Sequence, residues 1–123
     1  MQAKDFAMGA LTTHVLDTSR GTPAAGVLVD LYRLGEEAER VASVLTNDDG
    51  RCPGPLLDGD DFQVGEYELV FHAGDYFRAG GVELSEPAFL DHVVIRFGIA
   101  SADQHYHVPL LISPFGYSTY RGS

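Results

Sequence analysis

The sequence has a single cysteine, Cys52, so no disulfide can form within the chain. One thiol and no disulfide are typical of a reducing compartment. Basic residues are also scarce, since 8 Lys and Arg stand against 18 Asp and Glu, which gives a net charge of −10. This negative charge opposes binding to nucleic acid or to an anionic membrane surface.

Long apolar runs are missing as well. A membrane-spanning helix needs roughly 18 apolar residues, and no segment of the sequence comes close to that length. The first residues also lack the apolar centre of a signal peptide. We therefore expect a cytoplasmic protein without a membrane partner.

Motifs for common cofactors and metals are absent too. The sequence has no glycine-rich phosphate loop that opens a helix, no C-x-x-C, no H-E-x-x-H and no G-x-S-x-G. We therefore expect no cofactor and no bound metal. The 123 residues suit one domain whose core needs neither disulfide nor structural metal. We expect residues 1–10 to be a short extension and residues 11–123 to form that domain.

What the sequence does contain is a series of short apolar segments separated by 14 Gly and 6 Pro. Alternating apolar residues between turn formers predict β-strands. The predicted strands are residues 11–17, 27–34, 40–46, 67–71, 93–99, 106–112 and 117–121. Residues 75–81 open with an acid and close with two glycines, which predicts one short helix. The sequence thus predicts an all-β fold, a two-sheet antiparallel β-sandwich with one short helix.

The strand at residues 106–112 has one apolar face and one unusual face. Alternation directs Tyr106 and every second residue after it to the core, and His107 and Pro109 outward. Pro109 cannot donate to a ladder, which favours an edge strand or an unusual pairing. We expect residues 100–104 to form a hairpin turn before this strand.

The outward face of that strand should be covered. In the last predicted strand the same alternation puts Ser118 and Tyr120 together. Two neighbouring strands would then show few of the Lys or Glu side chains usual on exposed strands. A second copy of the chain, related by a two-fold axis, is the natural cover.

Two of the five histidines, His14 and His107, lie inside otherwise apolar strands. Histidine titrates near neutral pH, so either one can serve as a general base. His105 and His107 also have the spacing of metal ligands, and with His14 they could form a three-histidine zinc site. His72 and His92 have no evident partner and remain unassigned.

The last eighteen residues, YHVPLLISPFGYSTYRGS, resemble the C-terminal signature of the 5-hydroxyisourate hydrolases, the purine-degrading members of the transthyretin-like family. The resemblance continues in LTTHVLDTSRGTPAAGV, TNDDGRC and FLDHVVIRFGIA, and YRGS is its most specific part. It implies an eight-stranded β-sandwich and a homotetramer, a dimer of dimers with active sites at the mouths of a channel. It also implies hydrolysis of a ring amide of 5-hydroxyisourate to 2-oxo-4-hydroxy-4-carboxy-5-ureidoimidazoline in urate degradation.

The resemblance assigns roles to seven residues. It implies catalytic roles for His14, Arg51, His107 and Ser123, and substrate binding by Tyr120, Arg121 and Gly122. Ring opening needs a base for water and a cationic site for the developing oxyanion, which imidazole and guanidinium groups supply. The sequence leaves open which histidine is the base, and whether Ser123 acts through its hydroxyl or its carboxylate.

Two other functions remain open from the sequence. A carrier would bind a small aromatic ligand in the channel between subunits without converting it. A zinc-dependent hydrolase would use the same scaffold with a metal-bound water. His14, Arg51, His107 and the YRGS ending count against the carrier, and a metal analysis would separate the zinc-dependent hydrolase.

Overall fold

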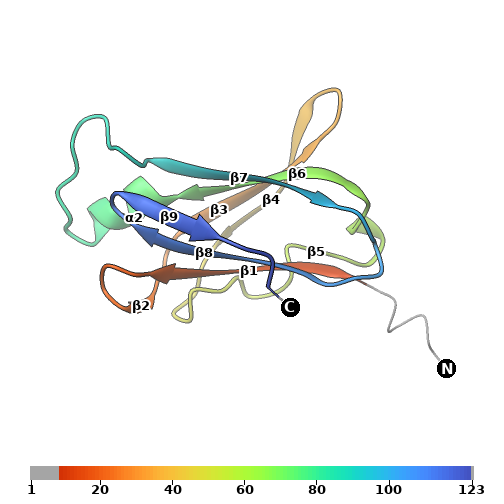
Figure 1. The fold of residues 1–123 in the computed structure, drawn as a ribbon, viewed down its shortest axis with the longest axis horizontal. Helices are drawn as coiled ribbons and strands as arrows, with labels where there is room; N and C mark the ends of the chain where they lie inside the picture. The colour runs from red at the N-terminus through yellow and green to blue at the C-terminus, as the bar shows by residue number, and fades with distance from the viewer. Residues whose placement is uncertain (1–8, 123) are drawn as a thin grey trace.

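The chain folds into two β-sheets that lie face to face, as the computed structural model shows for residues 9–122 (Figure 1). The first sheet, here called the β1 sheet, has the order β2 (Thr22–Pro23), β1 (Ala10–Asp17), β8 (Tyr106–Ser113) and β9 (Gly116–Thr119), and β5 (Leu57–Asp58) also pairs with β1. The second, the β3 sheet, has the order β4 (Ala38–Leu45), β3 (Leu28–Leu34), β6 (Gly65–His72) and β7 (His92–Ile99). The predicted sandwich is confirmed.

The helix α2 (Ala73–Ala79) lies at one end of the sandwich (Figure 1). It starts two residues before the predicted helix and ends before Gly80 and Gly81. Gly81 has a φ of 86°, in the left-handed region that glycine tolerates. Phe77 of the helix is buried in the core. The predicted single α-helix is therefore present among the described residues, accompanied by a 3₁₀ turn, η1 (Gly59–Asp61).

Alternation along the strands fills the space between the sheets. The β8 residues predicted to point inward are buried, namely Tyr106, Val108, Leu110 and Ile112, and so are the alternating residues Tyr67, Leu69 and Phe71 of β6. Full burial of each large apolar side chain contributes about 1.5–3 kcal/mol. His107 and Leu111, on the opposite face of β8, remain partly exposed.

The predicted strands match the observed ones to within a few residues at each end. The sequence did not reveal β2, β5 or η1, because a strand of two residues has no periodicity. β1 begins at Ala10, so its first residue falls within the predicted N-terminal extension. Residues 1–8 of that extension lie outside the described residues, and the domain boundary stays a prediction.

One strand pair departs from the antiparallel pattern, because β1 and β8 run parallel. Parallel neighbours need a long connection. Here all four strands of the β3 sheet lie between β1 and β8 in the sequence, and this long connection lets β8 run in the same direction as β1. This pairing brings residues 12–14 beside residues 107–109.

The predicted hairpin at residues 100–104 is wrong. β7 and β8 belong to different sheets, so the segment crosses from the β3 sheet to the β1 sheet. The backbone N–H groups of Ala100 and Ser101 donate to the Tyr106 hydroxyl at 2.9 and 3.2 Å. Backbone N–H groups of this loop therefore donate to a side chain, whereas those of a hairpin would pair with the facing strand.

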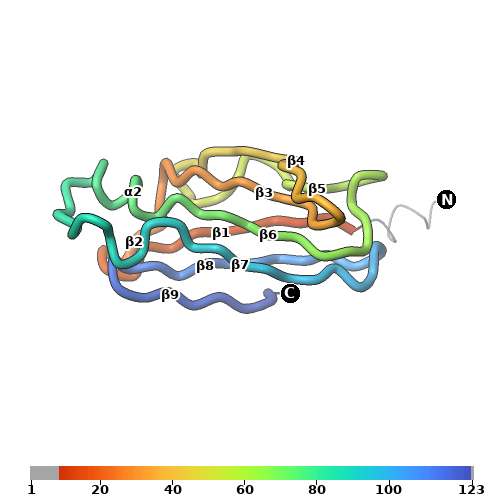
Figure 2. The backbone as a smooth tube through the Cα atoms, turned by 90° about the horizontal axis from the view of Figure 1, so that it is seen from above, coloured from red at the N-terminus to blue at the C-terminus, as the bar shows by residue number. Residues whose placement is uncertain are grey.

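Of the two alternatives predicted for Pro109, an edge strand or an unusual pairing, the structure shows the second. β8 lies between β1 and β9 (Figure 2). Because Pro109 has no N–H, the continuous ladder between β8 and β9 ends at the pair Leu110 and Thr119. The Thr119 hydroxyl donates to the Pro109 carbonyl at 2.7 Å, so this carbonyl has a hydrogen-bond partner beyond the end of the ladder. Among the described residues, no helix is long and apolar enough to cross a membrane.

Candidate active site

The parallel pair β1 and β8 places three polar side chains on the outward face of the β1 sheet. In its register, Thr12 lies opposite His107, and His14 lies opposite Pro109. Residues that face each other across a ladder share one face of the sheet, so His14 and His107 point the same way. All three polar side chains are half-buried.

A tight turn at residues 47–50 brings Arg51 to the other side of β1. Gly50 has a φ of 75°, and its carbonyl accepts a bond from the Val15 N–H at 2.8 Å. The Asn47 side-chain oxygen accepts the N–H groups of Asp49 and Arg51 at 2.9 and 3.1 Å. Arg51 thereby forms a bridge with His14.

The same turn fixes the ring of His14. Its Nε2 lies 2.9 Å from the Asp49 carbonyl oxygen. A carbonyl only accepts hydrogen bonds, so Nε2 of His14 carries the proton. In the neutral ring the lone pair is then on Nδ1.

His107 is held on its Nδ1 side by the Thr12 hydroxyl, at 2.8 Å. Burial lowers the pKa of His107 below its usual 6.5, and the positive charges of Arg51, His14 and His105 lower it further, against a smaller opposite effect of a hydrogen bond to the Thr12 backbone. Both main causes disfavour the charged ring. The neutral ring that results is the form a general base requires.

The C-terminal segment runs past His107 in the register of β9. The Gly122 N–H donates to the His107 carbonyl at 2.8 Å and forms an isolated bridge there. Tyr120, two residues earlier, is 61% exposed. Gly122 therefore lies at the histidine cluster, and the Tyr120 ring projects from the strand into solvent.

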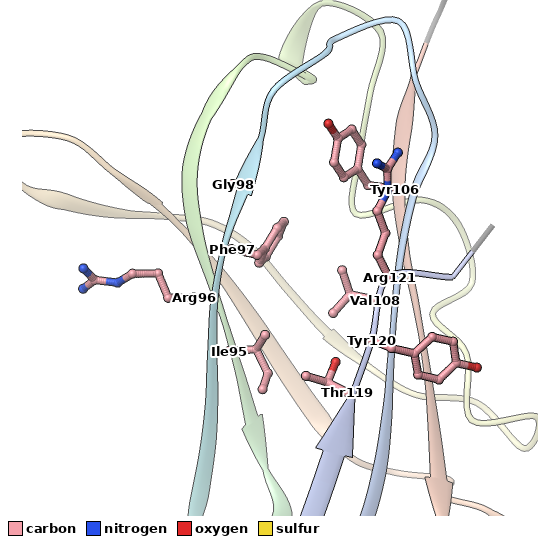
Figure 3. Close-up of a pocket in the computed structure, with 9 residues that line it drawn as sticks. All are labelled: Ile95, Arg96, Phe97, Gly98, Tyr106, Val108, Thr119, Tyr120 and Arg121. Atoms are coloured by element: carbon pink, nitrogen blue, oxygen red, sulfur yellow. The ribbon is translucent and has the colours of Figure 1, made fainter.

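Within one chain, the Arg121 side chain lies away from the cluster of His14, Arg51 and His107. Its guanidinium lies 3.8 Å from the centre of the Tyr106 ring and donates to the His105 carbonyl at 3.0 Å and to the Gln104 side chain at 3.2 Å. Figure 3 shows Arg121 beside Tyr106, with Tyr120 directed the other way. Within one chain, Arg51 is the guanidinium group that lies beside His14, and the substrate-binding role expected for Arg121 stays a prediction.

Arg121 instead borders an apolar cleft of about 240 Å³ between β7 and β9 (Figure 3). Ile95, Phe97 and Val108 line this cleft. It contains none of the histidines, so this apolar cleft and the histidine cluster occupy different places.

A second cleft, of about 220 Å³, adjoins the histidine face. Thr12, Arg51 and Cys52 are among its lining residues. Burial raises the pKa of the Cys52 thiol, so the sulfur stays protonated and is a poor nucleophile. Arg51 is thus the charged group that this cleft offers to a ligand.

Two further points concern the predicted ligand sets. Ser123 lies outside the described residues. Within residues 9–122, no group of three His, Cys, Asp or Glu side chains is arranged to hold a metal ion. His14, His105 and His107 therefore do not form the three-histidine zinc site in this chain.

Sequence reasoning missed two residues of this cluster, Thr12 and Asn47. Thr12 has the same strand face as His14 in the LTTHVLD segment, which was the available signal. Its contact with His107 depends on the parallel register, which no local pattern reveals. Asn47 opens the polar segment NDDG, which is typical of a turn, and its side-chain bonds to the turn follow from that geometry.

The fold and this cluster can now be compared with known proteins. Residues 11–122 match the model of the HIUase/Transthyretin family. The chain belongs to this family. A 5-hydroxyisourate hydrolase of Pseudomonas aeruginosa is 66% identical over 94% of this chain and 93% of its own length.

Solved structures agree with membership of the HIUase/Transthyretin family. The 5-hydroxyisourate hydrolase of Klebsiella pneumoniae has a TM-score of 0.78 and 39% identity, and the match covers 94% of this chain and 99% of that one. An (S)-allantoin synthase has a TM-score of 0.90 and 51% identity over 95% of this chain. This chain spans only 44% of that longer protein.

Proposed function

We propose that this protein is a hydrolase that opens a ring amide of 5-hydroxyisourate in urate degradation, giving 2-oxo-4-hydroxy-4-carboxy-5-ureidoimidazoline. Family membership and the 66% identity to a 5-hydroxyisourate hydrolase support this substrate. The observation that carries the chemistry is the meeting of His14, Arg51 and a neutral His107 on one sheet face.

His107 is the general base in this proposal. Its Nδ1 is engaged by Thr12, so Nε2 is the nitrogen that remains for water. The neutral ring takes a proton from water at Nε2 while the water oxygen attacks the ring carbonyl. Such proton transfer accounts for roughly 10²–10⁴-fold of a rate enhancement.

Arg51 and His14 complete the reaction. Arg51 stabilises the negative oxygen of the tetrahedral intermediate, and its charge also attracts an anionic substrate into an otherwise acidic protein. His14 orients the water or donates a proton to the leaving ring nitrogen. Because Nε2 of His14 donates to Asp49, its Nδ1 is the free nitrogen: the lone pair of the neutral ring orients the water, and Nδ1 donates only in the ring that carries a second proton.

The tail contributes substrate binding in the same proposal. Gly122 lies against His107, and Tyr120 projects from the same strand end. We assign both, with Arg121, to substrate binding, and Ser123 to catalysis through its hydroxyl or carboxylate. For Arg121, the side chain lies over Tyr106 in one chain, so contact with substrate requires a rearrangement or a second chain.

The proposal includes a homotetramer, a dimer of dimers, in the cytoplasm. The histidine cluster lies on an outward sheet face that is only half-buried in one chain, and a second copy would enclose it. The single Cys52 suits a reducing compartment. Light scattering on the purified protein tests the assembly by its mass.

An absorbance assay on freshly generated 5-hydroxyisourate tests the function. Catalytic amounts of protein should accelerate the decay of the substrate signal, and His107→Asn should remove most of that acceleration. His72→Asn is the matched control, because His72 bonds to Asp30 at 3.0 Å in the other sheet. Binding without accelerated decay would instead indicate a carrier.

A further inference from the structure

Thr12 contacts the histidines of the cluster, and neither the sequence motifs nor the proposed mechanism give it a role. Its hydroxyl oxygen lies 2.8 Å from Nδ1 of His107 and 3.1 Å from Nε2 of His105. One hydroxyl thus joins two imidazole rings. The parallel register of β1 and β8 sets this contact, because Thr12 lies directly opposite His107.

A hydroxyl that donates to one of two rings and accepts from the other has two arrangements of protons. It has one proton to donate and can accept from the other ring. If Thr12 donates to His107, then the neutral His107 ring carries its proton on Nε2 and has no lone pair for water. If Thr12 donates to His105 and accepts from Nδ1–H of His107, then Nε2 of His107 has the free lone pair.

We propose that Thr12 is a positioning residue that holds His107 as the Nδ1–H tautomer and connects its ring to His105 as a proton relay. This inference rests on the proposed role of His107 as the base. Thr12 touches no reacting atom and acts through His107. His105 is exposed to solvent, and His107 is half-buried.

The relay balances its protons at every step. His107 takes a proton from water at Nε2. Its Nδ1 proton passes to the Thr12 oxygen while the Thr12 proton passes to Nε2 of His105. When Nε2 of His107 gives its proton to the leaving nitrogen, the two transfers reverse. The net result is one proton moved from water to the leaving group.

The surrounding charges favour this direction. Arg51 follows the turn and His14 lies on β1, and positive charge on these two side chains disfavours a positive charge on His107. His105 lies on the solvent side, although Arg121 bonds to its backbone carbonyl at 3.0 Å. Moving the charge to His105 places it where water solvates it.

The test compares two changes at Thr12 with a matched hydroxyl deletion. Thr12→Val removes the hydroxyl and keeps the shape, and Thr12→Ser keeps the hydroxyl. Thr18→Val is the control. The Thr18 hydroxyl, just after β1, also bonds to β8: it donates to the Ile112 carbonyl at 3.0 Å and contacts no imidazole. Each variant is the full-length protein.

We expect Thr12→Val to lower kcat by about 10–100-fold, the usual effect of losing a partner that orients a functional imidazole, with KM nearly unchanged. Thr12→Ser should restore most of kcat, and Thr18→Val should retain it. Equal loss in Thr12→Ser and Thr12→Val, at equal melting temperatures, would overturn a role for the hydroxyl.

Imidazole ¹⁵N NMR provides a readout that needs no substrate. Wild-type His107 should show the Nδ1–H tautomer, and Thr12→Val should shift it toward Nε2–H. An Nε2–H tautomer in the wild type would overturn the inference. If the tautomer is as expected and 5-hydroxyisourate decays at its spontaneous rate, the proposed function fails and the Thr12 contact stands.

The His105 part of the relay has its own variant. His105→Gln removes the ring and its titration and retains an amide near Thr12. We expect kcat to fall and the tautomer of His107 to stay. An unchanged kcat would remove His105 from the relay.

Discussion

Gly122 lies directly against the imidazole ring of His107. Its N–H donates to the His107 carbonyl at 2.8 Å, and a Cβ atom at position 122 would come within 2.8 Å of Cδ2 of the ring. That separation is shorter than a van der Waals contact between carbon atoms. The glycine of the YRGS ending is therefore required by the close approach of the backbone to the ring.

Gly122→Ala should disable the site with little effect on folding. The methyl group must push away either the ring or the tail, and a displacement of about 1 Å near reacting groups costs on the order of 10²-fold in rate. Steady-state kinetics should show this loss, while denaturant unfolding changes by less than about 0.5 kcal/mol. Gly35→Ala is the matched control, since its Cβ would meet only one atom, at 3.9 Å. Full activity of Gly122→Ala would contradict the tight contact.

The depressed pKa of His107 predicts a pH effect in one direction. Burial is the first cause, and the positive charge of Arg51 is the next. Arg51→Gln removes that charge and should raise the pKa of His107 toward 6.5. An NMR titration of the His107 ring proton measures the midpoint. A midpoint that stays or falls would show that Arg51 does not act on His107.

The same shift links pH to stability. The unfolded chain binds a proton at His107 near pH 6.5, and the folded chain binds it only at lower pH. The contribution of His107 to the free energy of unfolding is therefore constant above that pH and is lost as the pH falls through 6.5 toward the folded pKa. In His107→Asn the unfolding free energy should decline less over this range, which urea unfolding at several pH values measures.

The fold was predictable where one strand carries its own signal. The alternation in residues 67–71 and 106–112 identified the buried faces of β6 and β8. The partners of a strand carry no such local signal. The parallel pairing of β1 with β8, and the crossing from β7 to β8, depend on connections and core packing across the whole chain.

The site was predictable in its residue types and only partly in its geometry. His14 and His107 stood out as histidines in apolar strands, and the resemblance supplied Arg51. The position of Arg121 over Tyr106 was not accessible from the sequence, because it depends on which face of the tail meets the core. Thr12 was overlooked for the same reason, since only the register shows its partner.

Asn47 should be needed to present Arg51. Its side-chain oxygen accepts the N–H groups of Asp49 and Arg51, and the Asp49 carbonyl in turn holds His14. Asn47→Ala removes both bonds, so we expect unfolding to become easier by about 1 kcal/mol. We also expect kcat/KM to fall. Asn47→Asp keeps an acceptor at the same position and should behave almost as the wild type. A change in stability alone would limit Asn47 to a structural role.

Arg121→Lys separates two roles of the tail arginine. The guanidinium carbon lies 3.8 Å from the centre of the Tyr106 ring, and the group also bonds to the His105 carbonyl. Lysine keeps the charge but loses the forked donors and the planar contact. In one chain these contacts hold the tail, so we expect a loss of about 0.5–1 kcal/mol in unfolding free energy and a lower kcat.

The split between kcat and KM decides whether Arg121 supports the tail or binds substrate. A tail support changes the placement of Gly122 and His107 and lowers kcat, with KM within about two-fold of wild type, because uniform substrate binding is unaffected. A large rise in KM at unchanged kcat would instead show that the guanidinium binds substrate. Gln104→Ala is the control, because it removes only the Gln104 bond to Arg121 and leaves the charge and the ring contact in place.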